Sequence, residues 1–185
     1  MEIGHMEQHE RLRVTNQLAA SRERLLNLVD GLTAEQWTFR PAEDRWSICD
    51  CVEHVTLVEH RLFGLIGKRL DSPAEAGSEE RPNHPEDDAV AAAVPDRSVR
   101  RQAPEPARPT GRWPDTNELL AEFEKARERT VRFTAATDAD LRNYSAPHPA
   151  FGNLDCYQWL IVMSLHGERH ARQIEEIKAD PAYPR

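Results

Sequence analysis

Three histidines stand at positions that suit a metal ion. His166 and His170 are four residues apart in a segment with a helical pattern, so their side chains project from one face, one turn apart. His54 lies far upstream, near the start of another helical pattern that begins at Ser47. Neutral imidazole nitrogen is a common ligand of divalent cations. We therefore predict a metal site formed by His54, His166 and His170.

The helical pattern around His166 and His170 places both side chains in an apolar stripe. Counted at 100° per residue from Trp159, both histidines and the flanking Met163 and Ile177 fall within about 40° of one direction. Burying two imidazoles among apolar side chains costs free energy unless their nitrogens find partners. A divalent cation is a suitable partner, and it needs a third ligand from a facing helix.

His54 is the histidine that meets this need. Cys51, Val58 and Leu65 lie within about 60° of it on their helix, so His54 belongs to the side facing the core. Cys51 is either a fourth ligand or, as buried free cysteines more often are, a small apolar side chain. Three ligands leave a coordination position open, as in catalytic rather than structural zinc sites. Zinc or nickel is expected first, with iron, manganese or copper as alternatives between which the residues do not choose.

Helical H-x-x-x-H pairs also occur without a metal. His5 and His9 form a second such pair near the N-terminus, which we interpret as unrelated to binding. Glu168 lies between the paired histidines but points about 180° away from them, and Glu53 is also poorly aimed, so neither is assigned as a general base. The catalytic residues therefore remain unassigned. Arg61 shares the face of His54 and could contact an anionic substrate group, or simply form an ion pair.

Two further kinds of side chain lie near the predicted site. His148 precedes the last helical segment and could line the mouth of a pocket. Trp46 and Trp159 are better explained by packing than by substrate binding.

Four long segments have the 3.6-residue periodicity of amphipathic helices, and they cover residues 9–29, 47–70, 115–137 and 154–178. A short link over 32–45 carries a capping-box pattern at Thr33 and Gln36, and 138–152 is predicted to be a loop without strands. The fold class that follows is all-α, a four-helix bundle in one domain spanning 1–185.

Residues 71–115 form a long connection between the second and third helices. They contain eight of the chain's 13 prolines, which oppose both helix and sheet pairing. A short helix is predicted over 89–94. The connection also carries a local basic patch, which is either a set of solvated charges or an anion-binding lid over the metal site: Arg97, Arg100, Arg101, Arg108 and Arg112.

The composition of the chain disfavours several classes of binding partner. The formal net charge of −8 disfavours nucleic acid and anionic lipid, and no apolar run approaches the roughly 20 residues of a membrane span. The N-terminus has no pattern of a secretory signal, and the three cysteines do not suggest a disulfide framework. We therefore expect a cytoplasmic protein that acts on a small molecule.

The chain resembles the DinB/YfiT-like superfamily of bacterial metal-dependent proteins. The resemblance rests on Arg45-Trp46-Ser47-Ile48 followed by His54, on Phe151-Gly152, and on the segment from His166 to Ile174. It extends from about His9 to Lys178.

This resemblance implies several further properties. It implies an up-down-down-up four-helix bundle in which a divalent metal is held by His54, His166 and His170. It also implies a metal-dependent hydrolase or an S-transferase that uses a low-molecular-weight thiol, and a homodimer. The alternative is a non-catalytic stress-response protein that binds a metal or a small ligand.

Overall fold

The computed structural model describes residues 6–72, 86–99 and 101–185. Four long helices dominate these residues, which confirms the predicted all-α bundle: α1 (Gln8–Val29), α3 (Ile48–Leu70), α5 (Thr116–Ala136) and α6 (Cys156–Lys178). None of the helices in the described part is long and apolar enough to cross a bilayer.

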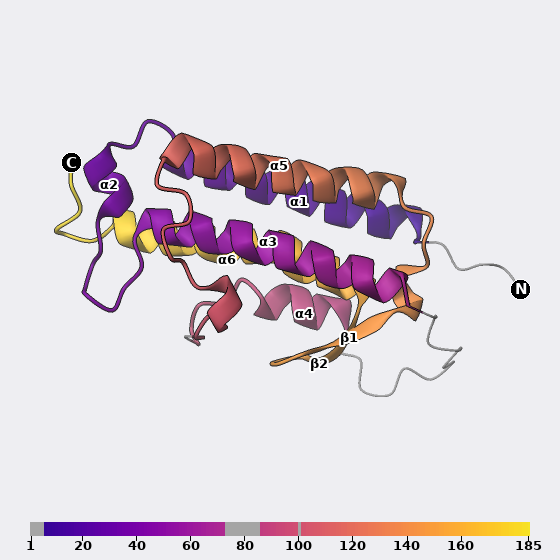
Figure 1. Cartoon of the computed structure of the whole chain (residues 1–185). Coiled ribbons are helices and arrows are strands. Elements are labelled where there is room, and N and C mark those ends of the chain that lie inside the picture. Colours follow the sequence, from indigo (N-terminus) through magenta and orange to yellow (C-terminus); the bar gives the residue numbers. More distant parts are fainter. Residues whose placement is uncertain (1–5, 73–85, 100) are drawn as a thin grey trace, which may run out of the picture.

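The four helices form two layers, with α1 and α5 in one and α3 and α6 in the other (Figure 1). Helices α1 and α6 run in one direction and α3 and α5 in the opposite one, which gives an up-down-down-up order (Figure 1). Because α3 and α5 run parallel, the chain between them must return along the whole length of the bundle. This return path crosses the outer side of the layer formed by α3 and α6 (Figure 1).

The helix starts follow from the capping residues. The Ser47 hydroxyl accepts the backbone N–H of Asp50 and the Asp50 carboxylate accepts that of Ser47, which closes a capping box at the start of α3. Asp155 and Gln158 form the same arrangement at the start of α6. The predicted box at Thr33 and Gln36 is present and starts the short helix α2 (Ala34–Thr38).

The return path contains the short helix α4 (Asp87–Ala93), which confirms a helical turn near the predicted 89–94, and a 3-10 turn, η1 (Glu105–Ala107). Helix α4 packs against α6, and η1 packs against α3. Val90 and Val94 are buried in the core cluster. The connection is therefore part of the packed structure where it is described.

The prediction that 138–152 is a loop without strands was wrong. A 3-10 turn, η2 (Leu141–Asn143), is followed by an antiparallel hairpin of β1 (Ser145–His148) and β2 (Gly152–Asp155). Gly152 adopts φ +75°, a left-handed conformation that favours glycine and allows the tight reversal. The strands have four residues each and one contains a proline, so they lack an alternating pattern long enough to recognise.

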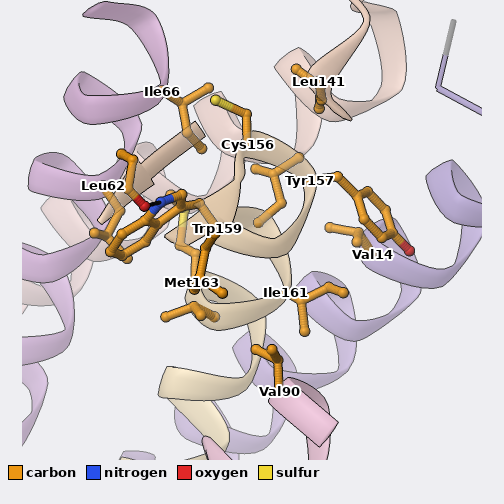
Figure 2. Packing of buried hydrophobic residues seen from close by; sticks show 14 of the residues in the cluster. Val14, Leu62, Ile66, Val90, Leu141, Cys156, Tyr157, Trp159, Ile161 and Met163 are labelled. Carbon is orange, nitrogen blue, oxygen red and sulfur yellow. Dashed lines mark hydrogen bonds between the residues drawn. The ribbon is translucent and has the colours of Figure 1, made fainter. Parts of the chain in front are cut away.

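The core is divided along the bundle into two clusters of buried apolar side chains. Figure 2 shows the cluster nearer the start of α6, where Trp159 and Met163 face Leu62 on one side of the helix and Tyr157 and Ile161 lie on the other. The second cluster lies nearer the C-terminal end of α6 and includes Ile174 and Ile177. His166 and His170 fall on α6 between Met163 and Ile174, at the junction of the two clusters.

Candidate metal centre

The structure brings His54, His166 and His170 together. One ligand nitrogen from each lies within 4.8 Å of the others. The two Nε2 atoms of His166 and His170 are 3.2 Å apart, and the ring of His54 lies 5.0 Å and 4.8 Å from their rings. His54, in the first two turns of α3, therefore meets His166 and His170 in the middle of α6, although the two segments are more than a hundred positions apart in sequence.

The outer ring nitrogens of two of these histidines are held by hydrogen-bond acceptors. His54 Nδ1 lies 2.6 Å from the carbonyl oxygen of Ala107, which can only accept, so Nδ1 carries the proton. His170 Nδ1 lies 3.0 Å from Oε1 of Gln173. The same oxygen accepts a bond of 3.1 Å from Arg97, which fixes it as the amide acceptor. In both rings Nε2 is left with its lone pair directed to the other histidines, as a metal ligand requires.

The electrostatic environment keeps the three imidazoles neutral. Burial lowers the pKa of His54, and burial together with neighbouring positive charge lowers the pKa values of His166 and His170 well below the ordinary histidine value. No carboxylate belongs to the cluster in the described residues. A neutral lone pair is the form of histidine that binds a metal.

Trp46 covers one side of the cluster. Its indole lies 4.8 Å from the His54 ring and stacks at 6.0 Å on the His170 ring, with 25° between the planes. Trp46 directly precedes the N-cap of α3, so the capping box that starts this helix also fixes the indole. Trp46 also packs against the core cluster that contains Ile174 and Ile177, and its role in packing rather than in substrate binding stays a prediction.

Glu53 fixes the return path above His54. Its side chain is buried, and its carboxylate accepts the backbone N–H groups of Thr110, Gly111 and Arg112 at 2.8, 3.0 and 3.3 Å. Gly111 has φ +74°, which allows successive N–H groups to converge on an anion. The held segment follows Ala107, whose carbonyl orients His54. We call this contact of Glu53 with residues 110–112 the Glu53 clamp.

The donor set fits a divalent cation. Three neutral imidazoles converge, and two of them have their second nitrogen hydrogen-bonded. The Nε2 atoms of His166 and His170 are 3.2 Å apart, which is close enough for both to bind one ion. His166 is half-buried while the other two are buried. His54, His166 and His170 are therefore the residues that would hold a metal.

Comparison with known proteins shows to which family the chain belongs. The model of the DinB superfamily matches residues 17–174. The chain belongs to the DinB superfamily. It is 24% identical over 152 residues to the uncharacterized protein YuaE of Bacillus subtilis (strain 168), a match that covers 82% of this chain and 89% of YuaE.

A solved structure shares the fold of this DinB protein. YfiT from Bacillus subtilis, described as a probable metal-dependent hydrolase with an unusual four-helix bundle topology, superposes with a TM-score of 0.64. The superposition covers 97% of this chain and 91% of YfiT, at 14% sequence identity. At that identity the likeness establishes the fold, which agrees with the resemblance inferred from sequence.

The other residues that the sequence suggested for the site lie outside the histidine cluster. Cys51 is buried and is not part of the cluster of ligand atoms that the three histidines form, which agrees with a small apolar residue. Burial also raises the pKa of its thiol. Glu168 points away from the triad and pairs with Arg24 and Arg172. Arg61 is exposed, and within the described residues no hydrogen bond or ion pair is formed by it. Its contact with substrate stays a prediction.

The predicted basic patch is mostly engaged in internal contacts. Arg97 pairs with Glu176, Arg108 donates to the carbonyl of Ala103, and Arg112 lies over the ring of Trp113. Arg100 lies outside the described residues. The guanidinium of Arg101 lies over the ring of Phe151.

Sequence reasoning missed the residues that orient the ligands. Gln173 lies on the stripe of His166 and His170, three positions after His170, so its spacing was a usable signal. Ala107 and the Glu53 clamp gave no such signal, because each contact joins positions more than 50 residues apart.

Proposed function

We propose that this DinB-superfamily protein is a metal-dependent enzyme acting on a small molecule, as a hydrolase or as an S-transferase that uses a low-molecular-weight thiol. The observation that carries the proposal is the convergence of three neutral imidazoles without a fourth protein ligand among the described residues. A divalent ion held by three histidines supplies Lewis acidity and lowers the pKa of a bound water or thiol.

The protein's own residues would hold and shield this chemistry. Ala107 and Gln173 fix the orientation of two ligand rings. Trp46 excludes water from one side, and the absence of a carboxylate from the described triad leaves the positive charge of the ion undiminished. Such a site favours substrates that develop negative charge during reaction.

Metal analysis of purified protein tests the first half of the proposal. Wild-type protein, reconstituted with zinc or nickel and desalted, should retain about one ion per chain, and His170→Ala should retain far less. His60→Ala is a matched control, because His60 lies on the same bundle but pairs with Glu122. Equal metal content in wild type and His170→Ala would refute the site.

Turnover tests the second half. Ester and amide hydrolysis and thiol conjugation should be measured with and without a chelator, in wild type and His170→Ala. Activity that disappears with the chelator and returns with the metal supports the enzyme. Activity indifferent to the chelator contradicts it.

A second candidate function is binding without catalysis. Its supporting observation is that no carboxylate in the described triad could act as a general base next to the ion. A large increase in Tm on adding metal, without turnover in any screen, favours this alternative. The homodimer remains a proposal from the family resemblance, and sizing of the purified protein tests it. The cytoplasmic location and the choice of zinc or nickel remain proposals from the sequence.

A further inference from the structure

The tip of the β1–β2 hairpin carries a histidine that no part of the proposed metal site uses. The hairpin packs on α6, where the indole N–H of Trp159 donates to the carbonyl of Ala146 at 3.3 Å. This contact places the ring of His148 5.1 Å from Trp159, and the ring of Phe151 stacks on its imidazole at 4.6 Å. His148 is therefore held between two aromatic rings.

The tautomer of His148 is fixed. The backbone N–H of Ala150 donates to Nδ1 at 3.1 Å, so Nδ1 is the acceptor and the proton of the neutral ring is on Nε2. Burial and the charge of Arg101 lower the pKa of His148 to about 4, so the ring is neutral near pH 7. Among the described residues His148 forms its hydrogen bond through Nδ1, and none is found for Nε2. An oriented N–H donor is thus left for a ligand.

Arg101 adds a positive charge beside this donor. Its guanidinium carbon is 5.8 Å from the centre of the Phe151 ring, and its side chain is exposed. Within the described part of the chain no carboxylate pairs with Arg101. Asp96 is close enough to be affected by its charge, but the Asp96 oxygens accept bonds from Ser98. Arg101 therefore differs from Arg97, whose donors are already satisfied.

The hairpin donor lies near the metal centre. Trp159 and His166 project from the same side of α6 and are seven residues apart, a rise of roughly 10 Å along the axis. Burial is the main cause that lowers the pKa of His166, and a charge on His148 is a minor further cause. A chain of about eight bonds spans roughly 10 Å, so a small molecule can reach from one to the other.

We propose that His148 Nε2 and the Arg101 guanidinium form a binding subsite for an anionic oxygen group, a carboxylate or a phosphate, on a small substrate. The reactive end of that substrate would lie at the three histidines, so this assignment rests on the proposed function. A neutral N–H donor and a guanidinium match two oxygens of one anion, and Phe151 and Trp159 provide apolar walls for the adjoining part of the molecule. A cationic group would meet Arg101 without a compensating carboxylate in the described site.

Binding of simple probes to metal-free protein tests this subsite without involving the metal. Benzoate and phenyl phosphate carry the two anionic groups on an apolar ring, and benzamide is the uncharged match to benzoate. Nitrogen-detected NMR of the histidine side chains reports directly on His148 Nε2. We expect benzoate, phenyl phosphate or both to shift this resonance and to bind at least tenfold more tightly than benzamide.

Two variants separate the donor from the charge. His148→Phe keeps the aromatic stack but removes the N–H, and Arg101→Gln removes the charge from an exposed side chain. Each should weaken binding of the anionic probe roughly tenfold or more. Arg132→Gln, an exposed arginine on α5, makes the same charge change away from the hairpin and should leave binding unchanged. Binding that is insensitive to both His148→Phe and Arg101→Gln, or equal binding of benzamide, would overturn the proposal.

The same titration with His170→Ala distinguishes this inference from the proposed function. If His170→Ala retains binding of the anionic probe while metal analysis finds no ion in wild type, the subsite stands and the metal-dependent function fails. If wild type holds a metal but no anionic probe binds, the function stands and the subsite fails. Phenyl phosphate binding without benzoate binding would identify the group as phosphate, and the reverse result as carboxylate.

Discussion

The bundle contains two clusters of buried polar side chains, one charged and one neutral. Arg127 of α5 and Glu59 of α3 form an ion pair with side chains 0% and 1% exposed. Between α3 and α6, three neutral histidines face one another. The first cluster contains full charges and the second contains none in the folded protein.

The difference lies in how completely the polar atoms are satisfied. Arg127 donates from Nε and Nη2 to the two oxygens of Glu59, and from Nη1 to the carbonyl of Leu18 and the hydroxyl of Ser21. In the histidine cluster the Nδ1 atoms of His54 and His170 have acceptors, while the Nε2 atoms converge on one another. We call the Arg127–Glu59 cluster closed, because its charged groups are paired with one another, and the histidine cluster open, because its Nε2 atoms can still bind a ligand. The closed cluster stabilises one arrangement of the helices, whereas the open cluster can still bind a metal.

The largest expected effect comes from opening the closed cluster. Arg127→Met leaves the Glu59 carboxylate buried without its partner, which should lower the free energy of unfolding by about 3–5 kcal/mol. Urea denaturation measures this loss. The double variant Arg127→Met/Glu59→Met should recover much of it, because no unpaired charge remains. A loss below about 1 kcal/mol in the single variant would show that the Glu59 carboxylate does not depend on Arg127 for its burial.

The next effect concerns the support of the open cluster. Glu53→Gln replaces the carboxylate of the Glu53 clamp with an amide of the same shape and weakens its three backbone contacts. Because the clamp holds the segment after Ala107, metal affinity should fall roughly 10- to 100-fold, the range for residues that orient metal ligands. Calorimetric titration with zinc measures it. Glu105→Gln, an exposed change in the same connection, should leave the affinity as in wild type.

The next prediction concerns the pH dependence of stability that the histidine cluster causes. The pKa values of the three histidines are lower in the folded protein than the ordinary value near 6.5, so below that pH the unfolded chain takes up protons first. The free energy of unfolding of metal-free protein should therefore fall by roughly 1–2 kcal/mol between pH 7.5 and 6.0. Urea denaturation at both values measures the change. A His166→Gln/His170→Gln variant should show a smaller fall, and an equal fall would place the titration elsewhere.

The smallest expected effect is at Cys51. Its buried, protonated thiol supports packing, so Cys51→Ala should lower the free energy of unfolding by about 1 kcal/mol and leave zinc affinity unchanged. A pronounced loss of zinc affinity in this variant would make the thiol a fourth ligand and the site closed.

The histidine cluster could be predicted from sequence because helical periodicity is local. The spacing of His166 and His170 and the apolar neighbours of His54 indicate the faces that these residues occupy, and the bundle brings the faces together. Arg127 was not predicted to be buried, although it lies next to the buried Ala126 on α5. Its burial depends on Glu59, Leu18 and Ser21, which come from two other helices, and no local pattern shows such a partnership.

The covering elements were predicted less well for the same reason. The connection was recognised by its prolines, but its contacts with His54 and Glu53 depend on where it returns across the bundle. The hairpin was missed because its strands are too short to show alternation. The subsite that we assign to His148 therefore lies in a segment whose structure could not be predicted from sequence.

The Glu53 clamp has a consequence for the order of folding. The four helices can associate through local periodic faces, but the contact of Ala107 with His54 and those of residues 110–112 with Glu53 each join positions more than 50 residues apart. Closing loops of that length is among the slower steps for a small domain. The metal site would then form late in folding. In a refolding experiment, the rate of zinc uptake would report the docking of the connection, and the rate of helix formation would be measured separately.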